Sequence, residues 1–501
     1  MDDKERFIEV SEKLVRGLLR EALGYTVESV ISYYRGIFGF MVEAPLLWIR
    51  HSRFPILFVA YDGSRADILT DVVKQLEMAR ATEFFALLIV VPTEHGTGNE
   101  AEELRLAVND SVFRHDFVVL DHQHLASIIA YNNARRLVEI IIEQGVELST
   151  LSPYVVRGPV PANMFFGREQ EIKEISQAVA QVNYALVGGR RIGKSSILQS
   201  LDRLMTRDPR FSSFYLNCED AYDYEGFYGI LNLRFGDRFT DRTPQTVRHL
   251  LGLLRTETEA KHLIFLLDEV DALLDFDALA NPAGQLFRTF RALAHERACS
   301  FVFSGSKTLY HHLHDARSPF FNFCSDLTLG PLAEKSVAEI VSKPMHQLGI
   351  KLTNEDALIG QIIDLTSCHP SLVQWLCARL VRGAERRVVG QDELDLVASS
   401  DEFYHYFIET AWGDATPLEK LVSVVLNQPE FSAEELFTAA AQYGLRNRVV
   451  LREALDMLRL YSLIEAHQGR FRYVLKHYPT IVRLAEDVPS LIEFWLSQVE
   501  A

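Results

Sequence analysis

The sequence predicts an α/β protein with several domains, and three observations support this. Short apolar runs such as FPILFVAY and FFALLIVV alternate with segments whose apolar residues recur at helical spacing. The chain has 501 residues, enough for about three domains of ordinary size. Beyond residue 333 the pattern becomes almost wholly helical, which is typical of a separate unit following an α/β sheet.

The charge and hydropathy of the chain exclude some classes of function. The formal net charge is -17, which disfavours a long electrostatic track for nucleic acid but permits a local basic patch. The first residues, MDDKERFIEV, lack the apolar core of a signal peptide. The longest apolar runs fall short of the ~20 residues that a membrane helix needs, so we expect buried strands and no membrane partner.

The cysteines indicate a reducing environment. No two of them form a CxxC pair, so we expect neither a zinc site nor a disulfide framework, and a cytoplasmic location fits. The five are Cys218, Cys299, Cys324, Cys368 and Cys377.

The C-terminal third predicts a winged helix. Three helical patterns, in TPLEKLVSVVLN, FSAEELFTAAAQYG and RNRVVLREALDMLRLYS, precede the segment LIEAHQGRFRYVL. This segment reads as a β-hairpin that turns at Gln468 and Gly469. Three helices followed by a hairpin is the element order of a winged helix.

Proline and glycine mark one candidate linker. Pro153, Gly158, Pro159 and Pro161 exclude a helix there and disfavour a central strand. We therefore expect an α/β N-terminal domain at 1–150, the linker at 151–162, a second α/β domain at 163–332, a helical lid domain at 333–400, the winged-helix domain at 410–480 and a terminal helix at 481–501.

The stretch NYALVGGRRIGKSSIL predicts a phosphate-binding loop between a strand and a helix. Its glycines let backbone N–H groups turn toward a phosphate, and the helix N-terminus adds its positive end. Lys194 can reach the β- and γ-phosphates, and the Ser195 hydroxyl can ligate Mg²⁺. The loop residues expected to surround the phosphates of ATP or ADP are Gly188, Gly189, Ile192, Gly193, Lys194, Ser195 and Ser196.

An acidic partner for this loop follows in HLIFLLDEVDALL. Leu263 to Leu267 predict a strand buried on both faces, with Asp268 and Glu269 at its end. We expect Asp268 to hold Mg²⁺ through water and Glu269 to be the base that polarises the attacking water. Alone, the two carboxylates would be a solvated pair, but the upstream loop favours the catalytic interpretation.

A third strand, CSFVFSGS, ends near Ser306. A polar residue there can contact the γ-phosphate, but serine also commonly caps the loop after a strand. Both interpretations of Ser306 stay open at this point.

Six motifs occur in a fixed order: FFGREQEIKEI, GGRRIGKSSIL, IFLLDEVD, FSGS, LGPL and CHPSLVQWLC. Together they resemble the STAND NTPases, the signal-transduction ATPases with numerous domains, in the prokaryotic branch close to the archaeal ATPases. The resemblance covers residues 163–478. It implies an ASCE/AAA+-like P-loop NTPase core with a helical lid and a winged-helix domain.

The resemblance also implies roles for matched residues. Pro370 would press on the base, and His369 would approach the phosphates as the lid closes over the nucleotide; without the family, His369 would be a capping or core histidine. Arg317 is a weaker candidate for an arginine finger. The resemblance also implies that the adenine and ribose side of the pocket is lined by Phe166, Gly167, Arg168 and Glu169. Phosphate or a neighbouring subunit would be contacted by Arg190 and Arg191.

In such proteins the nucleotide is mainly a switch. The ADP form is closed and monomeric, and the ATP form assembles by self-association. The resemblance therefore implies a slow, regulatory ATPase that binds ATP or ADP with Mg²⁺. The repeat array that usually follows in this family is not found after Val482, which leaves the sensing role unassigned.

The first 150 residues are weakly similar to a restriction-endonuclease-like fold. Such nucleases need an Asp and a Glu-x-Lys around Mg²⁺, but LFVAYDG stands where Glu-x-Lys is expected. Asp62 and Asp67 fit turn positions better than ligand positions. We therefore expect a catalytically inactive module that contacts an unknown protein partner.

A competing hypothesis is an ATP-dependent DNA-binding factor resembling replication initiators, and a third is a scaffold that binds nucleotide for stability alone. The acidic residues Glu434, Glu435, Glu453 and Asp456 dilute the basic surface of the winged helix, which favours protein packing over DNA. The arginines on which DNA binding would depend are Arg446, Arg448, Arg452, Arg459, Arg470 and Arg472.

Overall fold

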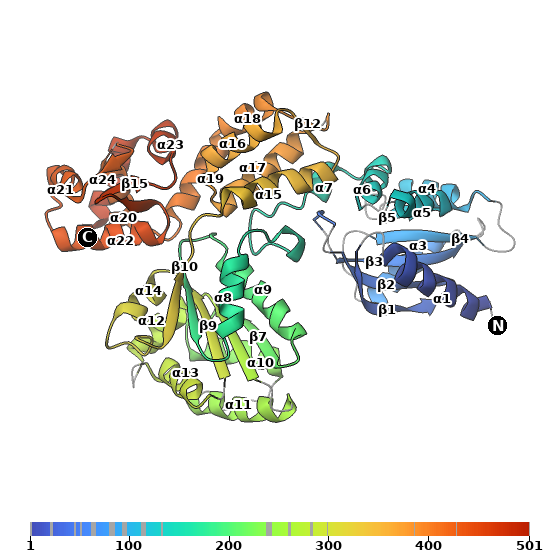
Figure 1. Cartoon of the computed structure of the whole chain (residues 1–501), viewed down its shortest axis with the longest axis horizontal. Coiled ribbons are helices and arrows are strands. Elements are labelled where there is room, and N and C mark those ends of the chain that lie inside the picture. The colour runs from blue at the N-terminus through green and yellow to red at the C-terminus, as the bar shows by residue number, and fades with distance from the viewer. Residues whose placement is uncertain are drawn as a thin grey trace.

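The chain folds into several packed units around a group of central helices. Figure 1 shows a parallel sheet with its helices below these central helices, the N-terminal elements on one side and the C-terminal elements on the other. The computed structural model describes residues 3–20, 24–44, 47–50, 53–61, 67–79, 86–92, 98–111, 117–131, 134–236, 243–258, 262–280, 284–297, 299–384, 386–426 and 428–499.

The N-terminal block, residues 3–151, is built on a five-stranded sheet of order β1-β2-β3-β4-β5. The first three strands are antiparallel, whereas β3, β4 and β5 run parallel, so helices must connect the later strands. The strands are β1 Thr26–Tyr34, β2 Ile37–Glu43, β3 Arg53–Tyr61, β4 Ala86–Pro92 and β5 Phe117–Leu120. The helices are α1 Asp3–Lys13, η1 Leu14–Leu19, α3 Ile68–Met78, α4 Glu100–Asn109, α5 His122–Tyr131, α6 Ala134–Glu143 and α7 Leu148–Leu151.

The second sheet has five parallel strands in the order β10-β6-β9-β8-β7. The apolar runs predicted to be buried strands are buried, because helices cover both faces of this sheet. The strands are β6 Asn183–Val187, β7 Phe211–Asn217, β8 His262–Asp268, β9 Cys299–Gly305 and β10 Cys324–Thr328. The associated helices are η2 Ala162–Met164, α8 Glu169–Ala178, α9 Lys194–Arg207, α10 Tyr224–Phe235, α11 Pro244–Glu257, α12 Asp271–Leu279, α13 Gln285–His295 and α14 Lys307–His314.

The lid helices follow the second sheet and occupy the centre of the molecule (Figure 1). They pack against both flanking units, since α15 contacts α6 and α17 contacts α7 of the N-terminal block. The helices are α15 Glu334–Gln347, α16 Glu355–Thr366, α17 Pro370–Gly383, α18 Gln391–Ala398 and α19 Asp401–Trp412, with the short strands β11 Lys351–Leu352 and β12 Val388–Val389 between them.

The C-terminal block, residues 413–499, contains the three predicted helices and the predicted hairpin. Thr416 and Ser432 cap the first two helices, each in a capping box with a glutamate three residues later. The elements are α20 Pro417–Val425, β13 Glu430–Phe431, α21 Ala433–Gln442, α22 Arg448–Leu460, β14 Ile464–His467, β15 Arg470–Tyr473, α23 Tyr478–Ala485 and α24 Val488–Val499. The three strands form one antiparallel sheet, and α24 packs on α20.

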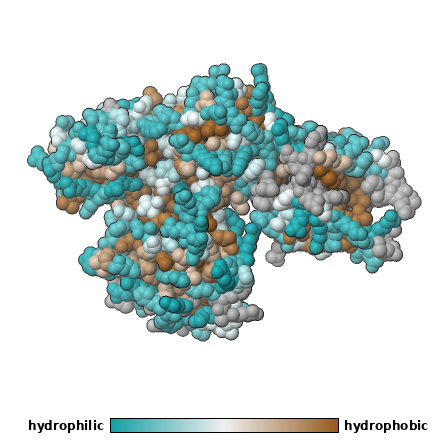
Figure 2. Space-filling model, viewed as in Figure 1, coloured by the Kyte–Doolittle hydropathy of each residue, from teal (hydrophilic) through white to brown (hydrophobic). Residues whose placement is uncertain are grey.

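The face of the molecule seen in Figure 2 is mostly polar. Figure 2 shows a mostly hydrophilic face with hydrophobic residues scattered over the lid helices and the second sheet. Among the residues that the structure describes, no helix is long and apolar enough to cross a membrane. All five cysteines are free.

Candidate nucleotide-binding site

The glycine-rich loop connects β6 to α9, as the sequence predicts. Three of its residues have left-handed backbone, with φ of 151° at Gly188, 62° at Arg191 and 106° at Gly193. No atom lies within 4 Å of a β-carbon built on Gly193, so backbone conformation rather than space requires glycine there. Such a loop directs successive N–H groups inward and forms a concave site for an anion at the N-terminus of α9.

Lys194 is the first residue of α9 and its side chain is buried. Its ammonium donates hydrogen bonds to the carbonyl oxygens of Gly188 at 2.9 Å and Gly189 at 3.2 Å. These bonds hold the positively charged ammonium beside the loop, where it can bind phosphate oxygens.

Asp268 ends β8 at the same edge of the sheet and is 1% exposed. Its carboxylate accepts hydrogen bonds from the hydroxyl of Tyr215 on β7, at 2.8 Å, and from the hydroxyl of Ser304 on β9. Because these bonds come from both neighbouring strands, the carboxylate has a fixed orientation, as a ligand that acts through a metal-bound water requires.

Glu269 follows at the turn after β8, with φ of 52°. Its backbone N–H donates to the Ser304 hydroxyl at 3.2 Å. Burial raises the pKa of the Glu269 carboxyl to about 7, and the carboxylates of Asp268, Asp271 and Asp414 add to this, while Lys194 opposes it. A carboxyl with a pKa near neutrality suits a general base.

These groups surround a cavity of about 630 Å³, a size typical of sites for small ligands and cofactors. The loop, the end of β8 and the lid all contribute to its wall. The predicted site residues that line it are Phe166, Arg168, Arg190, Arg191, Ile192, Gly193, Lys194, Ser195, Ser196, Asp268, Glu269 and Pro370.

Seven predicted residues do not line this cavity: Gly167, Glu169, Gly188, Gly189, Ser306, Arg317 and His369. Gly188 and Gly189 instead hold Lys194 through their carbonyl groups. Gly167 has φ of 64°, and a β-carbon there would lie 2.2 Å from the Ser336 hydroxyl, so it allows α15 to approach.

Ser306 and His369 lie beside the cavity. The Ser306 hydroxyl bonds the Gly188 carbonyl at 3.2 Å and the Asp414 carboxylate at 2.7 Å, so it joins the loop to the C-terminal block. His369 caps α17 and is 3% exposed. Burial lowers the pKa of His369 to about 3, helped by Arg168 and Arg191, and its Nδ1 has no hydrogen-bond partner among the described residues.

The predicted arginines are held by the protein itself. Arg168 donates to the carbonyls of Ile192 at 3.2 Å and Gly330 at 2.5 Å, which fixes the loop to the strand end beyond β10. Arg191 pairs with Glu409 of α19 at 2.8 Å. Arg317 is 91% exposed and pairs with Asp315, so it does not contribute to the cavity in this chain.

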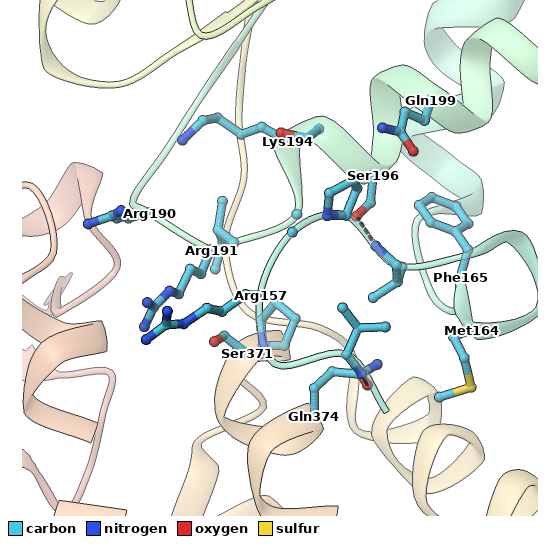
Figure 3. A pocket seen from close by; sticks show the side chains of 18 of the residues that line it. Arg157, Met164, Phe165, Arg190, Arg191, Lys194, Ser196, Gln199, Ser371 and Gln374 are labelled. Atoms are coloured by element: carbon cyan, nitrogen blue, oxygen red, sulfur yellow. Dashed lines mark hydrogen bonds between the residues drawn. The ribbon is translucent and has the colours of Figure 1, made fainter. Parts of the chain in front are cut away.

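Several lining residues were missed, among them Arg157, Gln199, Tyr215 and Gln374. In Figure 3 the Arg157 and Arg191 side chains lie side by side, and a hydrogen bond joins Ser196 to the segment 155–160. A signal was available for Gln374, which lies one helical turn after Pro370 and therefore shares its face. Tyr215 could not be found because the sequence does not reveal which strand neighbours β8.

The N-terminal block shows no group of metal-ligating side chains among its described residues. In the part of the chain that the structure describes, no three His, Cys, Asp or Glu residues lie together as a metal site would require. Asp67 precedes α3, and Asp62 lies outside the described residues.

The donor set fits a magnesium-bound nucleotide. The loop N–H groups and Lys194 suit phosphate, the Ser195 hydroxyl and Asp268 suit Mg²⁺, and the mixed apolar wall with Phe166 and Pro370 suits a purine. The fit follows from the chemistry of the residues present.

Comparison with known proteins agrees with this geometry. Residues 158–376 match the family described as novel STAND NTPase 1. No curated protein matches the chain.

Among solved structures, a Walker-type ATPase from Pyrococcus abyssi is 15% identical, with a TM-score of 0.51, and the match covers 66% of this chain and 99% of that one. The ORC2 protein of Aeropyrum pernix, in its ADPNP–ADP complexes, is also 15% identical, with a TM-score of 0.48 and coverage of 66% and 97%.

The first of these structures supports the AAA+-like P-loop fold. The family match indicates the STAND class of NTPases for residues 158–376. Residues 158–376 of this chain therefore form a P-loop NTPase domain of the STAND class.

Proposed function

We propose that this protein is a nucleotide-dependent switch that binds ATP, hydrolyses it slowly and regulates an interaction module in the N-terminal block. The observation that carries this proposal is the contact between the glycine-rich loop and the C-terminal block. A β-carbon on Gly189 would lie 2.8 Å from the carbonyl oxygen of Tyr461. The C-terminal block therefore rests directly on the loop that would hold the phosphates.

Further bonds cross the same junction. Ser306 bonds Asp414, and Lys307 pairs with Glu419 at 2.7 Å. Both Ser306 and Lys307 follow β9, beside the loop, whereas Asp414 and Glu419 belong to the C-terminal block. These bonds join the P-loop core to the C-terminal block in the closed state, and they would break when the two separate.

The charges around Lys194 explain why a triphosphate would favour opening. Burial mainly raises the pKa of Glu269, and the nearby carboxylates of Asp271 and Asp414 add to this. A γ-phosphate at the loop would add negative charge beside Asp414, which the closed arrangement holds through Ser306. Like charges at short range repel, so we propose that ADP is compatible with the closed state and that ATP weakens it.

The chain's own residues can also support hydrolysis. Lys194 would neutralise phosphate charge, Ser195 and Asp268 would hold Mg²⁺, and Glu269 would accept a proton from the attacking water. Bound Mg²⁺ would supply charge neutralisation for the phosphates. We propose a low turnover, because the residues that contact the loop also restrain it in the closed state.

We further propose that 410–480 is a winged-helix domain used for packing rather than for DNA. Four of its arginines form ion pairs within the block, among them Arg448 with Glu434 at 3.0 Å and Arg470 with Glu435 at 2.9 Å. For the alternative function, an ATP-dependent DNA-binding factor, we expect affinity that falls steeply with salt. Binding that is absent at low salt would remove that alternative.

The proposed function is tested by the nucleotide that the purified protein carries and by its turnover. We expect tightly bound ADP in the protein as isolated and slow release of phosphate from added ATP. Absence of nucleotide binding would overturn the proposal, and binding without hydrolysis or change of state would leave only a scaffold. For the N-terminal block, we expect no Mg²⁺-dependent cleavage of DNA by the full chain.

A further inference from the structure

The segment predicted as a linker lines the nucleotide cavity. We call residues 152–164 the strap. Its members Val155, Arg157, Val160 and Met164 all contribute to the cavity wall. Pro and Gly content predicted a connection without helix or strand, and residues 152–161 have neither, with η2 following at Ala162–Met164. The connection is hydrogen-bonded to the lid and to the loop on either side of residues 157–159, which are exposed.

Bonds to the lid hold the first half of the strap. The Tyr154 hydroxyl donates to the Ile340 carbonyl of α15 at 2.9 Å. The backbone N–H of Val155 donates to the Gln374 side chain of α17 at 3.1 Å. These two bonds fix the strap against the helices that cover the cavity.

Bonds to the loop and to α19 hold its middle. The Val160 N–H donates to the hydroxyl of Ser196, two residues after Lys194, at 3.2 Å (Figure 3). The Val156 carbonyl accepts a bond from Tyr406 at 3.1 Å. The strap therefore touches the phosphate-binding loop and the lid at once.

The far end of the strap is tied to the N-terminal block through Asn163. This side chain is 4% exposed, and its amide group donates to the carbonyls of Leu47 at 2.8 Å and Ile49 at 3.1 Å. The next residue, Met164, lines the cavity. Asn163 thus contacts the N-terminal block, and the residue that follows it in the chain forms part of the wall of the nucleotide site.

The loop 47–50 that Asn163 binds is held from outside the N-terminal sheet. Trp48 N–H donates to the Gln347 side chain of α15, and Arg50 N–H donates to the Leu151 carbonyl at the end of α7, at 2.9 Å. The side chains of Leu47, Ile49 and Met164 belong to one continuous buried cluster. These contacts therefore join loop 47–50 to the strap and to the lid.

We propose that Asn163 is a positioning residue of the nucleotide site, which makes nucleotide release depend on how the N-terminal block is attached. By thermodynamic reciprocity, bound nucleotide then strengthens the attachment of loop 47–50. This inference rests on the proposed function, since it assigns the route by which the module and the nucleotide influence one another.

The sharpest variant is Asn163→Asp in the full chain. It preserves volume but replaces an amide donor by a carboxylate that faces two carbonyl oxygens. The matched control is Gln144→Glu, because Gln144 also bonds a backbone through its amide, at Val119 in the N-terminal block, away from the strap.

The measurement is the dissociation rate of a fluorescent ADP analogue. We expect Asn163→Asp to raise it about thirtyfold, the factor that corresponds to the loss of two ordinary hydrogen bonds, and Gln144→Glu to leave it unchanged. In the wild type, ADP should also slow hydrogen exchange at the amides of Trp48 and Arg50, and this protection should vanish in Asn163→Asp.

Each outcome decides between the two proposals. If the wild type binds no ADP, the proposed function fails. If it binds ADP but Asn163→Asp releases it at the wild-type rate, or Gln144→Glu accelerates release equally, the coupling through Asn163 is wrong. Should Asn163→Asp not fold, the same measurement on Asn163→Ala, which removes the donor without adding charge, gives the decision.

Discussion

The ammonium of Lys307 lies 2.7 Å from the carboxylate of Glu419 and joins the P-loop core to the C-terminal block. The Glu419 side chain is 4% exposed and also accepts a bond from the N–H of Thr416, at 2.7 Å. It caps α20 while it contacts the core, so the ion pair links the position of a whole helix to the strand end beside the glycine-rich loop.

Replacement of Lys307 by Met should loosen this junction. The change leaves a nearly buried carboxylate without its cation, which we expect to cost the closed state about 1–2 kcal/mol because Lys307 is partly solvated. The concentration of a non-hydrolysable ATP analogue that gives half-maximal self-association should fall accordingly. Lys13→Met is the control, since the Lys13–Glu9 pair is exposed within α1; an equal effect in both variants would contradict the assignment.

Lys194→Ala should weaken nucleotide binding by about a hundredfold or more, because charge-assisted hydrogen bonds to phosphate are lost. The variant also removes the bonds to Gly188 and Gly189, so its folding is checked by thermal unfolding. Fluorescence titration with a labelled nucleotide measures the affinity. Lys173→Ala, exposed on α8, should bind like the wild type; unchanged affinity in Lys194→Ala would place the phosphates elsewhere.

Glu269→Gln should still bind ATP but hydrolyse it about a hundredfold more slowly, since the variant lacks the general base. A phosphate-release assay under single-turnover conditions separates the two steps. Glu219→Gln is the matched control, because Glu219 lines the same cavity but is exposed and follows β7 rather than β8. Normal turnover in Glu269→Gln would show that another group is the base.

The pH dependence of hydrolysis gives an independent check on Glu269. A base must be deprotonated to act, and burial raises the pKa of Glu269 to about 7. The value of kcat/KM reports groups of the free enzyme, so it should rise with pH and level off above about 7. The same rise in Glu269→Gln would assign the titration to a different residue.

His369 should make the fold sensitive to acid. Its pKa is lowered from 6.5 to about 3 in the folded state, so the unfolded chain takes up a proton first as the pH falls. Stability is therefore lost below pH 6.5, by about 1.5 kcal/mol on reaching about pH 5. Urea unfolding of the wild type and of His369→Gln, at about pH 6.5 and about pH 5, measures this loss in the free energy of unfolding. His405→Gln, exposed on α19, should keep the wild-type loss; an unchanged loss in His369→Gln would contradict the effect.

Local pattern predicted the parts of the site that lie within one segment. Roles for Gly188, Lys194 and Asp268 could be proposed from the sequence because the loop and the strand end have fixed spacing, and their neighbours in the chain determine their geometry. Glu269 was proposed as its neighbour, although its raised pKa comes mainly from burial, with a contribution from Asp414, which lies far along the chain.

Contacts between distant segments could not be predicted. The approach of Tyr461 to Gly189 depends on how two folded units pack, and neither residue carries a sequence signal for it. The strap was predicted as a linker because Pro159 and Pro161 exclude regular structure. Its partners, such as Gln374 and Ser196, are fixed only by the tertiary fold.

The central claim is that nucleotide at the glycine-rich loop controls whether the C-terminal block stays closed upon it. The most direct test is the mass of the full chain in solution with Mg²⁺ and either ADP or a non-hydrolysable ATP analogue. We predict a monomer with ADP and a larger assembly with the analogue. The same mass in both conditions, with binding of both nucleotides demonstrated, would contradict the account.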